Sequence, residues 1–188
     1  MKVLALIGSY RTGGVIDSAV DEILAAAREG GADVEKIYLL DEYIEFCANC
    51  RACTQEAGVE RGTCVLDDDM GHILAAVDAA DALVLGSPVN FGTVTAVMKR
   101  FMERLICTAY WPWGNPVPRL RDTQTSKPAI VVASSAAPSL LARMSRHMVK
   151  ALKQTARCLG AQTEGVLFVG WAARNRHRDI GDRTRKKA

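Results

Sequence analysis

Five short apolar runs alternate with helix patterns along this chain, and this alternation constrains the fold more than any other feature. Each gap between successive runs contains a segment whose apolar residues recur every three or four positions, as in an amphipathic helix. Short apolar runs separated by helices indicate a parallel sheet covered on both faces. Right-handed crossovers leave few topologies, so we expect a doubly wound α/β fold with five parallel strands in the order 2-1-3-4-5. The expected strands are 3–7, 34–40, 82–85, 129–133 and 166–169.

The boundaries of the expected helices carry familiar signals. Gly30 and Gly31 end the first helix. The acidic triplet 67–69 precedes the second helix, and we expect it to cap that helix rather than to bind a metal ion, because acidic groups stabilise a helix N-terminus. Segment 107–127 contains three prolines and no clear period, so a loop is expected there.

Composition narrows the function classes. The chain has 188 residues, of which 49% are hydrophobic and 24% charged, as in a single globular domain. A net charge of +3 is too small to indicate a nucleic-acid partner. No apolar stretch reaches the roughly 20 residues of a spanning helix, and the first run is broken at Gly8 and Ser9. We therefore expect no membrane partner, no signal peptide and a cytoplasmic location.

Four closely spaced cysteines are the clearest chemical signal in the sequence. Cys47, Cys50 and Cys53 follow a C-x2-C-x2-C spacing, and ten residues separate Cys53 from Cys64. This spacing lets thiolates converge and is typical of iron–sulfur ligation. A zinc site and unligated or redox-active thiols are the alternatives. A disulfide framework is not expected in a reducing compartment.

Small and polar residues follow three of the expected strands. They are GSYRTGG at 8–14, GSPVNFGT at 86–93 and SSAAP at 134–138. Ligands of doubly wound sheets bind beyond the carboxyl ends of the strands, between the first and third. Hydroxyls, backbone N–H groups and the guanidinium of Arg11 at a helix N-terminus suit a phosphate. The first segment has neither the Gly-Lys-Ser/Thr ending of a P-loop nor a G-x-G-x-x-G pattern.

Together these segments resemble the flavodoxin-like NAD(P)H-dependent FMN reductase superfamily, and its iron–sulfur flavoprotein branch in particular. The resemblance rests on GSYRTGG, on the cysteine segment running into CVLDDDM, and on GSPVNFGTVTAVMKRFMER. It implies a flavodoxin-like fold, FMN and a 4Fe–4S cluster as cofactors, NAD(P)H as a transient electron donor, and a homo-oligomer, either dimer or tetramer. The implied FMN-binding domain is 1–173 with a cysteine-rich insert at 46–66, followed by a basic tail at 174–188.

The resemblance also implies four groups of site residues. The FMN phosphate would be bound by Ser9, Arg11, Thr12, Gly13 and Gly14. The isoalloxazine ring would be bordered by Pro88, Val89, Asn90, Phe91 and Gly92, with Ser134, Ser135 and Ala136 at its other edge. The cluster ligands would be Cys47, Cys50, Cys53 and Cys64. No catalytic acid or base is expected, because the cofactors carry the chemistry.

Two departures from the family pattern concern FMN. Family members usually have Asn and then Thr or Ser where this chain has Val15 and Ile16, so two polar phosphate contacts are absent. We expect Arg11 to compensate for them. Asn90 replaces a tyrosine that many relatives place beside the ring.

The implied function is that of an FMN-dependent oxidoreductase that passes electrons between FMN and a 4Fe–4S cluster or a small acceptor. One alternative is a cluster-free NAD(P)H-dependent flavin or quinone reductase, and another is an electron carrier without turnover of its own. Small-molecule donors and acceptors are the expected partners, with a redox protein as a further candidate. Trp111 and Trp113 would either cover the flavin or lie at a subunit interface, and a nicotinamide would reach the flavin near the 110–113 loop.

Overall fold

The computed structural model describes residues 1–138, 146–172, 180 and 182–186. Its central sheet has five parallel strands in the order β2-β1-β3-β6-β7. Counted along the chain this is the order 2-1-3-4-5, so the expected doubly wound topology is confirmed. The five strands are β1 (Lys2–Ile7), β2 (Asp33–Tyr38), β3 (Ala82–Pro88), β6 (Lys127–Ser134) and β7 (Ala161–Val169).

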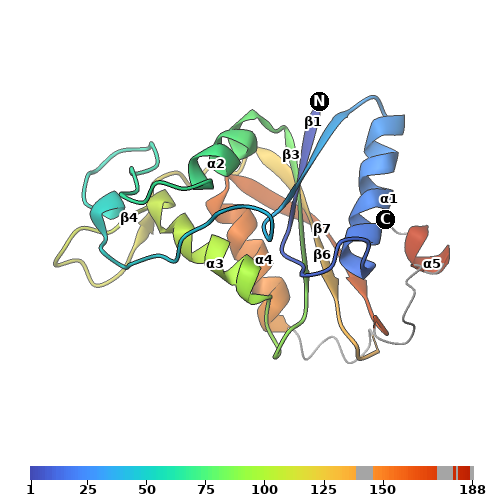
Figure 1. Ribbon diagram of the computed structural model, residues 1–188. Coiled ribbons are helices and arrows are strands. Elements are labelled where there is room, and N and C mark those ends of the chain that lie inside the picture. Colours follow the sequence, from blue (N-terminus) through green and yellow to red (C-terminus); the bar gives the residue numbers. More distant parts are fainter. Residues whose placement is uncertain (139–145, 173–179, 181, 187–188) are drawn as a thin grey trace.

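Helices cover both faces of this sheet, as continuous apolar strands require. Figure 1 shows α1 and α5 on one face and α2, α3 and α4 on the other. Two apolar layers fill the space between the sheet and the helices, one on each face. The helices are α1 (Val15–Glu29), α2 (Met70–Ala79), α3 (Ala96–Arg104), α4 (Arg146–Cys158) and α5 (Asp182–Arg185), with short 3-10 turns η1 (Ala52–Thr54) and η2 (Leu105–Thr108).

The segment expected to be a plain loop at 107–127 has structure of its own. Its two short strands, β4 (Ala109–Tyr110) and β5 (Arg119–Leu120), pair as an antiparallel hairpin. Residues 47–64, called the cysteine loop below, pack against this hairpin, where Trp111 N–H donates to the Thr54 carbonyl at 2.9 Å. Both project from the side of the sheet that α2 and α3 cover (Figure 1). The expected loop is thus present over most of this segment, but it also contains a short hairpin that the sequence did not predict.

The acidic triplet at 67–69 does more than cap α2. Asp69 lies at the N-cap, but its side chain makes no capping bond and instead accepts from the Tyr43 N–H at 2.7 Å. Asp68 accepts from the Met70 N–H at 3.2 Å, in the first turn, and also pairs with Arg104 of α3. The capping prediction is thus only partly right, because these carboxylates mainly fasten the two ends of the cysteine loop.

Two expectations from the sequence extend beyond the described residues. Most of the basic tail at 174–188 and the first part of the fourth expected helix, at 139–145, lie outside them. None of the described helices has the length and hydrophobicity needed to cross a bilayer.

Candidate functional site

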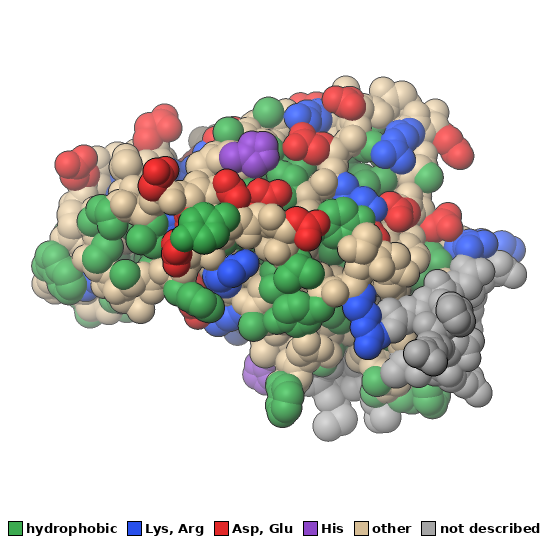
Figure 2. Space-filling view, in the orientation of Figure 1, with side chains coloured by type: hydrophobic (Ala, Val, Ile, Leu, Met, Phe, Trp, Pro, Cys, Tyr) green, Lys and Arg blue, Asp and Glu red, His purple; other side chains and the backbone are tan. Residues whose placement is uncertain are grey.

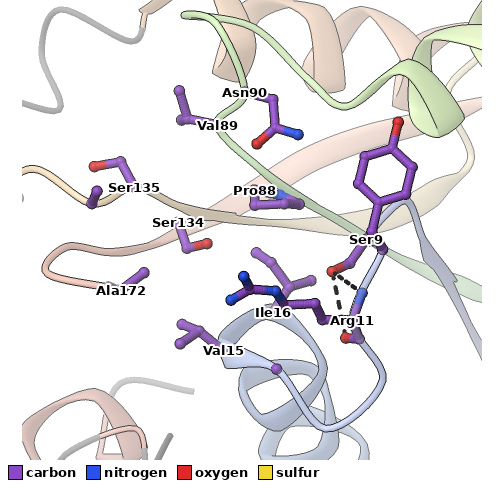
Figure 3. Close-up of a pocket in the computed structure, with 13 residues that line it drawn as sticks. Ser9, Arg11, Val15, Ile16, Pro88, Val89, Asn90, Ser134, Ser135 and Ala172 are labelled. Atoms are coloured by element: carbon purple, nitrogen blue, oxygen red, sulfur yellow. Dashed lines mark hydrogen bonds between the residues drawn. The ribbon is translucent and has the colours of Figure 1, made fainter. Parts of the chain in front are cut away.

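A cavity of about 430 Å³ opens at the carboxyl ends of β1, β3 and β6 (Figure 3). This is the point at which the sheet reverses its winding, where ligands of such folds bind. The volume lies within the range of small-molecule sites. The lining residues are Ser9, Tyr10, Arg11, Gly14, Val15, Ile16, Pro88, Val89, Asn90, Ser134, Ser135, Ala136 and Ala172.

The cavity gathers residues from all three loops named from the sequence. Four expected site residues, Thr12, Gly13, Phe91 and Gly92, are exposed and do not line it. Tyr10 and Ala172 line it although the sequence did not single them out, and Val15 and Ile16, expected only as departures from the family pattern, line it as well. Ala172 follows β7, and its N–H donates to the Ser135 carbonyl at 2.9 Å. The adjacency of the fourth and fifth strands in the expected order was the signal that could have found it.

One end of the cavity combines positive charge with a helix N-terminus. Gly14, Val15 and Ile16 line it at the start of the 15-residue helix α1. The unpaired N–H groups of that first turn and the helix dipole favour an anion. The Ser9 hydroxyl holds the turn, because it accepts from the Arg11 N–H at 3.2 Å (Figure 3). The backbone of Arg11 is therefore held in place where this residue lines the cavity.

Asp17, in the first turn of α1, holds the loop that precedes this helix. Its buried carboxylate accepts from the Gly13 N–H at 2.6 Å, from Lys36 Nζ at 2.7 Å and from the Tyr38 hydroxyl at 2.8 Å. Gly13 has a φ of 68°, a conformation that glycine adopts without strain. Burial alone would raise the pKa of Asp17, but the hydrogen bonds from Lys36, Gly13 and Tyr38 outweigh it and hold the pKa below its usual value.

Replacement of Asp17 by asparagine is expected to destabilise the protein by about 2 kcal/mol at pH 7, because hydrogen bonds to a buried charge are lost. A carboxylate with a lowered pKa contributes its full stability above the unfolded pKa of about 4 and loses it as the pH falls through the folded value. The difference in unfolding free energy between the unaltered protein and Asp17→Asn should therefore become smaller below pH 4. Urea unfolding at pH 7 and at pH 3.5 measures it.

The matched control for this prediction is Asp21→Asn. Asp21 also pairs with Lys36, at 2.6 Å, but its side chain is 56% exposed, so the expected loss is below about 1 kcal/mol. Equal losses of stability in Asp17→Asn and Asp21→Asn would contradict the role given to Asp17. A stability loss in Asp17→Asn that is the same at both pH values would also contradict it.

The other end of the cavity is bounded by backbone and small side chains. Val89 N–H donates to the Ser134 carbonyl at 2.7 Å, so the loops after β3 and β6 lie side by side. The buried Thr95 hydroxyl donates to the Gly8 carbonyl at 2.7 Å and accepts from Met98 N–H at 3.1 Å. Thr95 thereby ties the end of β1 to the start of α3. The result is a rigid, mainly uncharged slot suited to a flat ring.

A second hollow of about 390 Å³ adjoins the cavity and shares Tyr10 and Asn90 with it. Phe91 and Met102 also line this hollow. Asn90 and Thr93 bond to each other in both directions across a tight turn, in which Phe91 has a φ of 47° and its ring is fully exposed. The hollow is thus mainly apolar and shares a wall with the cavity.

The cysteine loop holds its four thiols in different environments. Cys53 is 7% exposed, Cys50 is exposed, and Cys47 and Cys64 are half-buried. Burial, and then the nearby thiols of Cys64, Cys47 and Cys50, raise the pKa of Cys53. The four sulfurs are therefore electrostatic neighbours. Within the described part of the chain, however, no three His, Cys, Asp or Glu side chains have an arrangement that could hold a metal ion.

Arginines fasten the cysteine loop. Arg121 donates to the Cys53 carbonyl at 3.0 Å and to the Glu56 carbonyl at 2.8 Å. Arg104 donates to Cys64 Sγ at 3.3 Å. These bonds give the loop a defined shape and a cationic surrounding.

Cys107 is a fifth thiol in this neighbourhood. Burial, together with the nearby thiols of Cys53 and Cys64, raises the pKa of Cys107 to about 11. Its carbonyl accepts from the Gly62 N–H at 3.0 Å, which connects η2 to the cysteine loop.

The two tryptophans of the 109–120 hairpin belong to the cysteine loop rather than to the cavity. The Arg51 guanidinium lies 3.9 Å from the Trp111 ring centroid and 4.2 Å from that of Trp113. Neither ring lines the cavity. Trp113 is 66% exposed, and hydrophobic side chains are visible at this end of the molecule in Figure 2. The two expectations for these rings, a cover over a flavin or a subunit interface, therefore both stay predictions.

The sequence of this chain is similar to a known family and to several curated proteins. A family model described as NADPH-dependent FMN reductase matches residues 1–169. An iron–sulfur flavoprotein of Archaeoglobus fulgidus is 33% identical over 115 residues, which are 61% of this chain and 48% of the relative. An iron–sulfur flavoprotein of Methanocaldococcus jannaschii is 39% identical over 104 residues, which are 55% and 51% of the two chains. This chain thus spans about half the length of the curated relatives it matches.

Solved structures show the same fold. An FMN-dependent NADH-azoreductase from Bacillus anthracis, solved in complex with FMN, has a TM-score of 0.68 and 16% identity, with 100% of this chain and 95% of that chain covered. An NAD(P)H:quinone oxidoreductase from Methanothermobacter marburgensis has a TM-score of 0.64 and 17% identity, with 99% and 88% covered. At these identities the likeness concerns the fold.

Proposed function

This chain belongs to the NADPH-dependent FMN reductase family, and from that premise we propose that it is an FMN-dependent oxidoreductase of the iron–sulfur flavoprotein type with NAD(P)H as its electron donor. The observation that carries the proposal is the cavity at the winding reversal, which has a cationic helix N-terminus at one end and an uncharged slot at the other. A phosphorylated flat ring has the same two-part chemistry.

The residues present fit FMN. Arg11 and the first turn of α1 would bind the phosphate, while Pro88–Asn90 and Ser134–Ala136 would border the ring. Bound FMN accepts hydride as an electron pair, whereas an iron–sulfur cluster exchanges single electrons. The second hollow, which shares Tyr10 and Asn90 with the cavity, would position the nicotinamide or a small acceptor against the ring. It replaces the 110–113 loop as the proposed approach, because that loop packs on the cysteine loop.

Cys47, Cys50, Cys53 and Cys64 would hold the cluster. Their fit rests on donor chemistry, since four thiols lie in one loop that arginines fasten, and the other three lie close enough to Cys53 to raise its pKa. Thiolates repel one another, and bound iron neutralises that repulsion. The names of the relatives support this part of the proposal. In the domain organisation we propose, residues 1–173 form the FMN-binding unit and 46–66 its cysteine-rich insert.

Replacement of Arg11 by alanine is expected to weaken FMN binding about tenfold, because an exposed charge-assisted hydrogen bond to the phosphate is lost. Riboflavin lacks the phosphate, so its affinity should change less than twofold. Flavin fluorescence quenching on apoprotein measures both dissociation constants. Arg28→Ala, at the exposed far end of α1, is the control. Equal weakening for FMN and riboflavin would contradict a phosphate contact.

A second candidate function is a cluster-free NAD(P)H-dependent flavin or quinone reductase. One observation favours it, which is that the described cysteines show no ready-made metal geometry. The two functions share the FMN cavity and differ only at the cysteine loop. Iron and acid-labile sulfide near four each per chain indicate a 4Fe–4S cluster, and their absence after anaerobic reconstitution indicates the cluster-free enzyme.

Rapid anaerobic mixing of FMN-loaded protein with NADPH, and separately with NADH, tests the proposed activity. The flavin absorbance should bleach with at least one donor and return when a quinone is added, with repeated turnover. Bleaching without turnover would instead identify an electron carrier. A protein that binds FMN but is reduced by neither nucleotide would overturn the assignment of the donor.

A further inference from the structure

Arg104, the last residue of α3, is a buried charge with an unusual set of partners. Its side chain is 2% exposed, and that of its ion-pair partner Asp68 is 1% exposed. A buried ion pair costs desolvation that a hydrophobic pair would avoid, so it contributes little net stability. Fold stability alone therefore gives a weak reason for a guanidinium at this position.

The guanidinium joins both ends of the cysteine loop. Nη1 pairs with the Asp68 carboxylate and donates to the Glu45 carbonyl at 3.0 Å, two residues before Cys47. Nη2 donates to Asp68 Oδ1 at 3.1 Å and to Cys64 Sγ at 3.3 Å. The planar guanidinium thus bonds to Glu45 before the cysteine loop, to Asp68 after it, and to the sulfur of Cys64 within it. Lysine has a single ammonium and cannot match this arrangement.

The bond to Cys64 Sγ has an electronic consequence for any cluster held there. Hydrogen bonds to cluster sulfurs and nearby charge set the reduction potential of iron–sulfur centres. The guanidinium keeps its proton throughout the physiological pH range. A fixed positive donor stabilises the state with one more electron, so it raises the potential.

We propose that Arg104 is a positioning residue that sets the reduction potential of the cluster through its hydrogen bond to Cys64 Sγ, with Asp68 holding the guanidinium in place. This inference rests on the proposed cluster. The couple involved is a one-electron couple in which the cluster gains one electron from its donor. No bond forms or breaks, and Arg104 neither gains nor loses a proton.

Two variants of the anaerobically reconstituted protein should shift the potential in opposite directions. Arg104→Lys withdraws the donor from Cys64, so the equilibrium constant for cluster reduction should fall about tenfold, which is about 59 mV for one electron. Asp68→Asn keeps a side-chain oxygen that accepts from the guanidinium, which the Glu45 carbonyl also holds, but it removes the negative charge, so the potential should rise. Mediated redox titration followed by EPR measures both. Arg157→Lys, an exposed arginine in the last turn of α4, should leave the potential unchanged.

A measurement on the unaltered protein guards against variants that do not fold. With ¹⁵N-labelled arginine, pulsed EPR of the reduced protein should show hyperfine coupling to a guanidinium nitrogen. Opposite shifts in the two variants, or that coupling, support the inference. Iron retained with an unchanged potential in Arg104→Lys, shifts of the same sign, or no coupling would overturn it. Protein that takes up no iron and sulfide refutes the cluster itself, and the role of Arg104 with it, whereas FMN binding is unaffected by that result.

Discussion

Replacement of Cys53 by serine is expected to remove nearly all iron and acid-labile sulfide from the anaerobically reconstituted protein, while FMN affinity stays within about twofold. Serine is a poor ligand for iron–sulfur clusters, which are held by thiolates. Cys53 is the most buried of the four loop thiols, and its own thiol is coupled to the other three. Cys53 lies within η1, where Arg121 donates to the Cys53 carbonyl and the Thr54 hydroxyl donates to the Arg51 carbonyl. Its loss should therefore not be compensated by movement of the loop.

Iron, sulfide and FMN analysis of the same preparation checks this result. Cys158→Ser is the matched control, because Cys158 lies on α4 outside the cysteine loop. That variant should keep its full iron content. Cys53→Ser protein that retains iron and sulfide at the level of the unaltered chain would contradict the assigned ligand set. Zinc in place of iron in the unaltered protein would move the assignment to a structural metal site.

Replacement of Gly8 by alanine is expected to destabilise the protein by about 3 kcal/mol and to weaken FMN binding more than tenfold. A Cβ at this position would lie 2.5 Å from Met98 Cβ and 3.1 Å from Met98 Cα, so α3 would have to move away from the end of β1. Gly8 also donates to the Gly86 carbonyl at 2.8 Å and accepts from Thr95. That junction joins the phosphate end of the cavity to its ring end.

Chemical denaturation and FMN titration measure the two effects. Gly71→Ala is the control, because Gly71 lies in α2 and an added Cβ would meet nothing within 4 Å. Alanine there should stabilise the protein by about 0.5 kcal/mol through helix propensity and leave FMN affinity unchanged. If Gly8→Ala binds FMN like the unaltered protein, the close approach of α3 to β1 is not required for the site.

The order of the sheet could be predicted because the central strands β1, β3 and β6 contain continuous buried apolar runs, which can be recognised without knowledge of their neighbours. The loops around the cavity were found for a related reason, since the carboxyl ends of parallel strands meet at one edge. Val15 and Ile16 were noted as departures and do line the cavity. By contrast, Phe91 is exposed in a tight turn where it has a positive φ, and the local sequence does not predict this conformation.

Pairings between distant residues could not be predicted. Asp68 and Arg104 are 36 positions apart and meet only because α3 ends beside the cysteine loop. The carboxylate was read as a helix cap, because capping is a local interaction and the ion pair is not. Arg51 and Trp111 are 60 positions apart, and their stacking depends on a hairpin that three prolines made look irregular.

A crystal structure of the protein grown with saturating FMN tests the central assignment most directly. The predicted result is one FMN per chain, with the phosphate at the first turn of α1 beside Arg11 and the ring between Pro88–Asn90 and Ser134–Ala136. Full occupancy of FMN at any other surface, or an empty cavity at saturating FMN, would contradict it.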